Sequence, residues 1–167
     1  MSFLTQDQSA LAQEIATLLT AQDQTVCVAE GTTGGLVSAA LLSVAGASRY
    51  YAGGGVLYTL NSRVQLAGAD PDLFTDYRGT TAEMLASVAE SMRQWLDATW
   101  CIAESGLAGP TGGRFSTEPG KTTLAMAGPI EKTNVIETGL ADREANMIEF
   151  TTICLRFLRD VLLEAHI

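Results

Sequence analysis

Residues 25 to 44 read TVCVAEGTTGGLVSAALLSV, a pattern typical of a strand, a tight loop and a helix in that order. Thr25 to Ala29 is short and rich in β-formers, which predicts a buried strand. Glu30 to Gly35 contains three glycines and predicts a tight turn. The run from Leu36 to Val44 is rich in Ala and Leu, and it predicts a helix that begins directly after the loop.

A second glycine-rich loop follows another apolar segment. Trp100 to Ala103 predicts a buried strand, and Ser105 to Gly113 reads SGLAGPTGG. Ligands of open α/β sheets bind outside the carboxyl ends of strands, where loops supply backbone amides. One such loop is more often just a capped helix start after a turn, but two of them favour a shared pocket. Neither loop has the spacing of a Walker P-loop or of a dinucleotide fingerprint.

The remaining patterns alternate between helix and strand. Helices are expected from Leu11, with a capping box of Thr5 and Gln8, over Asn61 to Leu66, from Thr80 and Thr81, and from Asp142. Strands are expected over Arg49 to Tyr58 and, as antiparallel neighbours, over Lys121 to Ala127 and Asn134 to Glu137. The expected buried residues are Met84, Val88, Met92 and Trp95 on the helix that begins at Thr80 and Thr81, Met147, Phe150, Cys154, Phe157 and Val161 on the last helix, and Trp100. We therefore expect a single three-layer α/β domain over residues 1–167, with a mixed sheet flanked by helices.

The charge balance excludes some partners. Ten Lys and Arg against nineteen Asp and Glu give a formal charge of −9 and an isoelectric point near 4.4. Such a field repels nucleic acids and anionic bilayers, but backbone amides and one or two arginines can still hold a small anion. The polar start of the chain and the lack of a long apolar run predict a cytoplasmic protein without a membrane segment.

The cysteines and the histidine exclude two kinds of site. Cys27, Cys101 and Cys154 each lie in an apolar stretch, so we expect them to be small buried hydrophobic residues. The single histidine, His166, is the penultimate residue. A zinc site would have too few ligands and a Ser-His-Asp triad would have no base. These two kinds of site are therefore excluded, and we expect no cofactor.

Taken together, several motifs resemble one family. They are Ala29-Glu-Gly-Thr-Thr-Gly-Gly35, Gly54 to Tyr58, Ser105-Gly-Leu-Ala-Gly-Pro110 with Gly112-Gly113, and Asp142-Arg-Glu144 before the last helix. In order and spacing they are similar to the CinA C-terminal domain, from about Leu11 to Leu163. Characterised members are nicotinamide-nucleotide amidases, which convert nicotinamide mononucleotide to nicotinic acid mononucleotide and ammonia. The resemblance implies a pocket for a pyridine nucleotide or similar carboxamide, no metal, and self-association into a homo-oligomer.

The chain departs from the family pattern at its reactive positions. The family motif Ala-Glu-Ser-Cys-Thr-Gly-Gly supplies the proposed serine nucleophile, where this chain has Gly31, with Thr32 in place of the cysteine. The lysine proposed to activate that serine matches Arg63, and a family arginine matches Met147. Arginine stays protonated near neutral pH, so it is a poor base but a good clamp for anions.

The resemblance and the residue types together define the candidate site. The candidate catalytic residues are Glu30, as a base that activates water, Thr32, Tyr58 and Arg63. The candidate ligand-binding residues are Gly31, Thr33, Gly34, Gly35, Ser105, Gly106, Ala108, Gly109 and Arg143. Alternatives remain for several: a structural role for Glu30, a helix cap for Thr33, ordinary packing for Tyr58 and a pairing of Arg143 with Asp142 or Glu144. Lys121 is either a pocket residue or a solvated surface lysine.

Three functions follow from this pattern. The first is a diverged amidohydrolase whose ordinary deamidation is weak or absent. The second is a catalytically silent nucleotide-binding or regulatory subunit. The third is a relic without a ligand.

Overall fold

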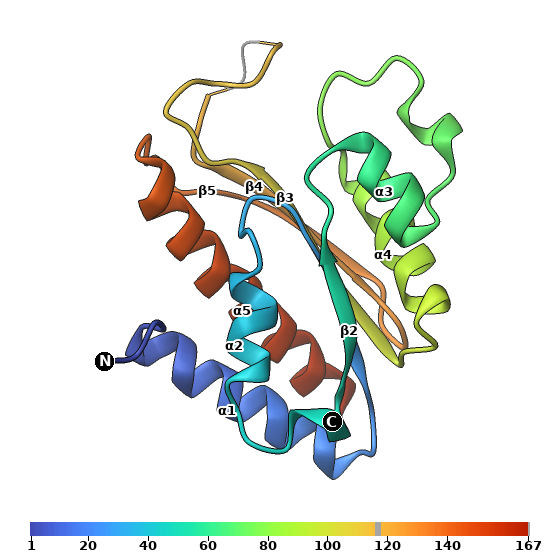
Figure 1. The fold of residues 1–167 in the computed structure, drawn as a ribbon, viewed down its shortest axis with the longest axis vertical. Helices are drawn as coiled ribbons and strands as arrows, with labels where there is room; N and C mark the ends of the chain where they lie inside the picture. The colour runs from blue at the N-terminus through green and yellow to red at the C-terminus, as the bar shows by residue number, and fades with distance from the viewer. Residues whose placement is uncertain (116–117, 167) are drawn as a thin grey trace.

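A computed structural model describes residues 1–115 and 118–166 and contains one five-stranded sheet (Figure 1). Its strand order is β2-β1-β3-β4-β5. The strands are β1 (Val26–Glu30), β2 (Tyr51–Val56), β3 (Trp100–Leu107), β4 (Lys121–Ala127) and β5 (Lys132–Glu137). β1 runs parallel to β2 and β3, whereas β4 is antiparallel to both β3 and β5. The mixed sheet and the antiparallel pair at the end of the sheet are confirmed.

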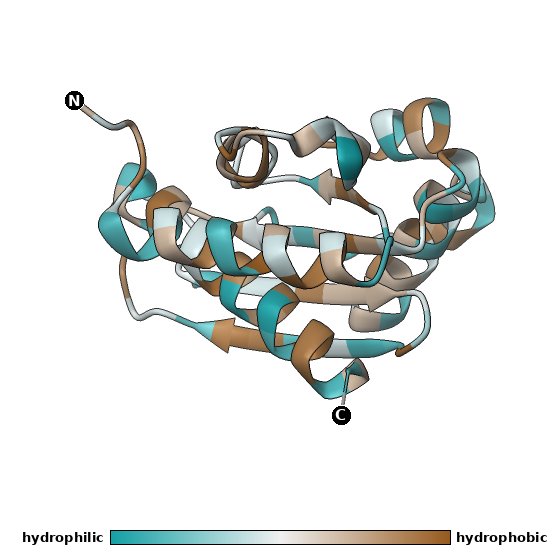
Figure 2. Cartoon of the chain, turned by 90° about the horizontal axis from the view of Figure 1, so that it is seen from below, coloured by the Kyte–Doolittle hydropathy of each residue, from teal (hydrophilic) through white to brown (hydrophobic). Residues whose placement is uncertain are grey.

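Helices cover both faces of the sheet, which confirms the expected three-layer α/β fold (Figure 1). One face packs against α1 (Gln6–Ala21), α2 (Leu36–Leu42) and α5 (Arg143–Ala165), and the other against α3 (Leu60–Ala67) and α4 (Ala82–Trp95). Two short 3-10 turns, Ala47–Arg49 and Pro71–Phe74, complete the connections. Hydrophilic and hydrophobic residues alternate along the covering helices (Figure 2), as expected where one side of a helix faces the sheet and the other faces water.

The alternation of side chains along the strands assigns each residue to a face. On β3, Trp100 and Ile102 contact the core beneath α1, α2 and α5, whereas Cys101 and Ala103 contact the core beneath α3 and α4. By the same alternation on β1, Val28 contacts the core beneath α1, α2 and α5, and Ala29 contacts the core beneath α3 and α4. Neighbouring residues at the ends of these strands therefore serve opposite sides of the sheet.

Several helix boundaries follow from capping. The Thr5 and Gln8 capping box begins α1, and the Asp142 side chain accepts the Ala145 amide at the start of α5. Thr81 caps α4 through the Met84 amide. These local signals were predicted and are confirmed.

Several expectations about burial and element boundaries were wrong. Trp95 is 70% exposed and Met84 is half-buried, because α4 turns Leu85, Val88, Ala89 and Met92 inward. On α5, Met147 is only half-buried, whereas Phe157, also half-buried, packs against the core as expected. β2 is shorter than expected, because Ala47–Arg49 forms a 3-10 turn. β3 extends through Leu107, into the expected loop, because its last residues pair with β4.

Within the residues that the structure describes, no helix is both long and apolar enough to cross a membrane. The three cysteines are free and fully buried, as expected. Burial raises the pKa of the Cys101 and Cys154 thiols well above the ordinary value.

Candidate functional site

The two glycine-rich loops lie in contact at the carboxyl ends of β1 and β3. These strands are parallel neighbours, so their carboxyl ends reach the same edge of the sheet (Figure 1). A Cβ atom added at Gly31 would lie 3.1 Å from the carbonyl oxygen of Glu104 and 3.6 Å from the Cα of Ser105. The topology thus places Gly31 directly beside the start of the second motif.

The first loop is organised by a buried carboxylate that sequence reasoning did not single out. Glu104, on β3, is 2% exposed. Its Oε2 accepts the backbone N–H groups of Gly31 at 3.2 Å and Thr33 at 3.1 Å. Its Oε1 accepts the hydroxyls of Thr32 and, at 2.7 Å, of Thr122. A glutamate at the end of an apolar strand was the available signal, because carboxylates are seldom fully buried without partners.

Glu30 performs the corresponding task for α2. Its carboxylate accepts the backbone amides of Val37 at 3.1 Å and Ser38 at 3.0 Å. It also accepts the hydroxyls of Ser38 at 2.6 Å and Thr33 at 2.7 Å. With two donors on each oxygen, a water molecule would have to displace one of them to reach this carboxylate. The expected cap at Thr33 is wrong: Gly35 occupies the cap position and Glu30 satisfies the first amides of α2.

The backbone conformation explains why glycine occupies the last two positions of this loop. Gly34 and Gly35 have φ angles of +64° and +100°, which side chains rarely adopt. A Cβ at Gly34 would also lie 3.1 Å from the Cε of Met147. Met147, the residue that replaces a family arginine, therefore packs on this loop.

Arg63 is buried on the opposite side of the sheet from Glu30. It lies on α3, which starts with a capping box of Thr59 and Ser62, and its exposed fraction is only 5%. Nη2 of Arg63 donates to the Ser105 Oγ at 2.8 Å, and Nη1 donates to the Thr80 Oγ1 at 3.0 Å. Burial lowers the pKa of the Arg63 guanidinium, while its interaction with Tyr77 and the charge of the Glu104 carboxylate act in the opposite direction.

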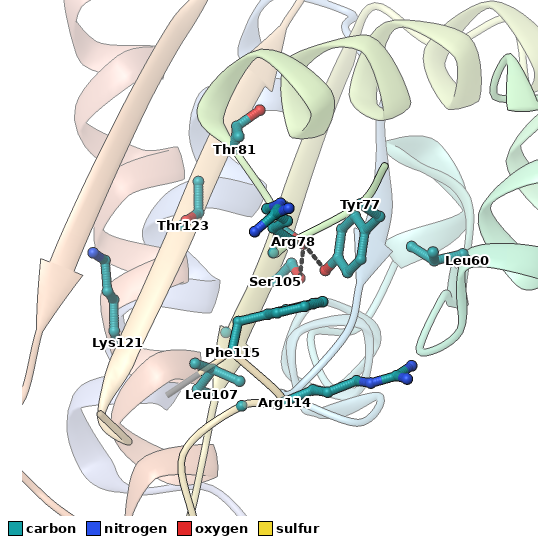
Figure 3. Close-up of a pocket in the computed structure, with 14 residues that line it drawn as sticks. Leu60, Tyr77, Arg78, Thr81, Ser105, Leu107, Arg114, Phe115, Lys121 and Thr123 are labelled. Atoms are coloured by element: carbon teal, nitrogen blue, oxygen red, sulfur yellow. Dashed lines mark hydrogen bonds between the residues drawn. The ribbon is translucent and has the colours of Figure 1, made fainter. Parts of the chain in front are cut away.

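Three hydroxyls form a chain beside this guanidinium, and we call Tyr77, Thr80 and Ser105 the hydroxyl cluster. The Tyr77 and Thr80 oxygens lie 3.0 Å apart, as do those of Thr80 and Ser105. Figure 3 draws these hydrogen bonds as dashed lines. A fixed cation therefore supports a row of groups that can each donate one proton.

The hydroxyl cluster opens into a cavity of about 640 Å³ (Figure 3). The cavity also has apolar walls and cationic side chains; the described lining residues are Leu60, Tyr77, Arg78, Gly79, Thr80, Thr81, Ser105, Gly106, Leu107, Gly113, Arg114, Phe115, Lys121 and Thr123. Of the candidate ligand-binding residues, it includes Ser105 and Gly106. The loop from Glu30 to Gly35 does not line this cavity. A hollow shared by both loops stays a prediction.

Tyr58 and Arg143 meet at a separate point. Arg143 donates to the Gly109 carbonyl at 2.8 Å and to the Tyr58 hydroxyl at 3.1 Å. Asn146 donates to the Ala108 carbonyl at 2.8 Å. In the part of the chain that the structure describes, Arg143 thus ties the second loop to Tyr58 and forms no ion pair with the acids beside it. Ala108, Gly109, Tyr58 and Arg143 do not line the 640 Å³ cavity.

The family comparison agrees with this architecture. The family model described as the CinA C-terminal domain matches residues 8–162. This chain belongs to the CinA C-terminal domain family. The resemblance drawn from the sequence motifs is thereby confirmed.

Curated relatives are similar over most of this CinA domain. A CinA-like protein of Desulfosudis oleivorans is 33% identical over 155 residues, which is 92% of this chain and 38% of that protein. One of Prochlorococcus marinus is 39% identical over 123 residues, 74% of this chain and 29% of that protein. This CinA domain therefore spans about a third of the length of those relatives.

Solved CinA structures have the same fold. The competence/damage inducible protein CihA from Agrobacterium tumefaciens superimposes with a TM-score of 0.86 at 26% identity, covering 97% of this chain and 99% of that one. A CinA superfamily protein from Klebsiella pneumoniae has a TM-score of 0.87 at 22% identity, covering 94% and 98%. At that identity the second likeness shows the fold alone.

Proposed function

We propose that this CinA domain binds a small nucleotide or carboxamide, and that it deamidates nicotinamide mononucleotide weakly or not at all. The observation that carries the proposal is the hydrogen bonding of Arg63, whose two terminal nitrogens donate to Ser105 and Thr80. A guanidinium in this role is a fixed donor, because it cannot release a proton near neutral pH. The lysine that the resemblance expects to activate a nucleophile is thus replaced by Arg63, which only donates hydrogen bonds to acceptors.

The nucleophile has no evident replacement in the first loop. Gly31 lacks a side chain, and the hydroxyl of the next residue, Thr32, donates to Glu104. The Thr33 hydroxyl lies 2.7 Å from Glu30 and 3.3 Å from Glu104. Both threonine hydroxyls therefore serve buried carboxylates on the face of the sheet away from Arg63. Attack on a carboxamide would require them to leave these bonds and to cross to the cavity.

A silent binding or regulatory subunit is the alternative, and the cavity itself favours it. The cavity volume of about 640 Å³ suits a ligand of nucleotide size. Its walls combine apolar side chains with cations, although the reactive pair that the family resemblance implies is missing. We further propose a cytoplasmic homo-oligomer; the three free thiols fit a reducing compartment.

The test combines binding with turnover on the same protein. Nicotinamide mononucleotide and small carboxamides are titrated while the melting temperature is followed, and ammonia release is measured in parallel. The expected result is stabilisation by a nucleotide without appreciable ammonia, because a ligand that binds only the folded state raises its stability. Turnover at rates ordinary for an enzyme, about 1 s⁻¹ or more, would contradict impaired deamidation. Flat melting curves with every compound would contradict the proposed ligand class.

A further inference from the structure

The hydroxyl cluster has one hydroxyl proton more than it has internal hydrogen bonds. Tyr77, Thr80 and Ser105 carry one hydroxyl proton each, and two oxygen-oxygen contacts join them. Each contact uses one proton, so at least one hydroxyl must donate outside the cluster. Arg63 cannot accept it, because a guanidinium only donates. All three residues line the cavity, so the surplus donor is available to a ligand there.

The charged side chains around the cavity are cationic, so they favour the same kind of ligand as this hydroxyl donor, a hydrogen-bond acceptor. Arg78, Arg114 and Lys121 line it, and the lining residues that the structure describes include no Asp or Glu. Lys121 lies 3.9 Å from Glu137, so part of its charge is shared with that exposed carboxylate. The grouping is pronounced in a chain that has ten basic residues and a formal charge of −9.

The nearest buried carboxylate, Glu104, raises the pKa of Arg63 by its charge, but its oxygens are held by other donors. Glu104 precedes Ser105 on β3, but its oxygens bind the first loop and Thr122. Side chains of consecutive strand residues point to opposite faces, so the sheet lies between the Glu104 carboxylate and the cavity. Arg63 therefore donates to neutral hydroxyls on its own face of the sheet.

We infer that this cavity binds an oxyanion, a carboxylate or a phosphate, at the hydroxyl cluster backed by Arg63. The inference rests on the proposed function for the body of the ligand and adds the charge of the group that is recognised. A guanidinium and a surplus hydroxyl offer only donors, and charged acceptors form the stronger hydrogen bonds. A carboxamide would turn one donating NH₂ group toward this donor-rich environment, whereas a carboxylate would present two acceptors.

Four pyridine compounds distinguish the two sources of the oxyanion. Nicotinic acid mononucleotide has a carboxylate where nicotinamide mononucleotide has a carboxamide. The two corresponding ribosides lack the phosphate. Affinities are measured by isothermal titration calorimetry at constant ionic strength. We expect loss of the recognised oxyanion to weaken binding about tenfold, the ratio typical of a charged compared with a neutral acceptor. If the amide binds more weakly than the acid, the recognised oxyanion is the carboxylate. If the riboside binds more weakly than the nucleotide, it is the phosphate.

Variants test whether Arg63 is responsible. Arg63→Gln retains a donor but removes the charge, so the tenfold preference should disappear, whereas Arg63→Lys should retain it. Thr80→Val with Ser105→Ala removes both hydroxyls that accept from Arg63 and should also abolish it. Lys132→Gln is the matched control, because Lys132 pairs with Glu164 at 2.6 Å and does not line the cavity. Melting curves of each variant confirm folding before affinities are compared.

The outcomes separate this inference from the proposed function. Phenyl phosphate, an aromatic oxyanion without a nucleoside, is titrated alongside. If it binds the unmodified chain but not Arg63→Gln, while no pyridine compound binds, the oxyanion site stands and the proposed ligand class is wrong. A second outcome is that pyridine compounds bind with affinities that differ by no more than about twofold between charged and uncharged compounds, and between the unmodified chain and Arg63→Gln. That result overturns the oxyanion site and leaves the proposed function standing. If nothing binds, both are overturned.

Discussion

The backbone N–H of Gly31 donates to the Glu104 carboxylate at 3.2 Å, although 73 residues separate the two in sequence. A Cβ atom at Gly31 would lie 3.1 Å from the backbone carbonyl oxygen of Glu104, so a side chain there requires this backbone to shift by a few tenths of an ångström. The position at which relatives are expected to hold a nucleophile is therefore anchored to β3 and has little room. Both relations can be tested by substitution.

Restoring the expected reactive pair should restore some activity. Gly31→Ser with Arg63→Lys supplies a hydroxyl and a group that can act as a base once it is deprotonated. Deamidation of nicotinamide mononucleotide, followed by ammonia release, should rise on the order of 100-fold above the unmodified chain, since removing a nucleophile and its base costs several orders of magnitude. The matched control is Gly31→Ala with Arg63→Lys, which has the same Cβ but no hydroxyl. Equal rates in the two folded double variants would show that the hydroxyl does not act as nucleophile.

Glu104 should contribute strongly to stability. Glu104→Gln replaces one acceptor oxygen by an NH₂ group that faces amide or hydroxyl donors, so buried partners lose their acceptor. We expect the free energy of unfolding to fall by about 3 kcal/mol. Urea denaturation measures the change. Glu131→Gln, at an exposed glutamate, should change it by less than about 0.5 kcal/mol, and a similarly small effect at Glu104 would contradict the organising role.

The buried thiols predict how stability depends on pH. Because burial raises the folded-state pKa of Cys101 and Cys154, the unfolded chain loses thiol protons first as the pH rises. Their contribution is fully present below about pH 8.5, the unfolded value, and declines above it. The free energy of unfolding should therefore fall by up to about 1.4 kcal/mol per pH unit for each thiol. Denaturation between pH 7 and 9.5 measures this slope. Cys154→Ala should be less stable at neutral pH but have a shallower slope, and an unchanged slope would count against the assignment.

The two tryptophans should behave in opposite ways. Trp100 is fully buried and its Nε1 donates to Gln24 at 2.8 Å, whereas Trp95 is 70% exposed. Trp100→Ala should cost about 4 kcal/mol of stability and Trp95→Ala less than about 1 kcal/mol. Acrylamide should quench the fluorescence of the Trp100→Phe variant, which retains Trp95, much more than that of Trp95→Phe. Equal quenching would contradict the difference in exposure.

Local patterns were sufficient for much of the fold. Thr5 with Gln8, Thr81 and Asp142 mark helix starts through contacts within three residues, so composition and spacing suffice to predict them. The alternation of strand and helix patterns likewise predicted the mixed α/β sheet. The failures are at longer range. Trp95 lies at the end of α4, where the direction of the helix relative to the sheet sets its exposure, and β3 lengthened because β4 pairs with its last residues.

The candidate site divides in the same way. Glycine content and family resemblance were enough to find both loops, Arg63 and the departures at Gly31 and Met147. The roles of Glu30 and Glu104 as acceptors, the joining of Arg63 to Ser105 and Thr80, and the cationic cavity arise from residues far apart in the chain. Such groups meet only when the sheet assembles, because hydrogen-bond geometry and burial depend on distances that spacing along a chain does not encode.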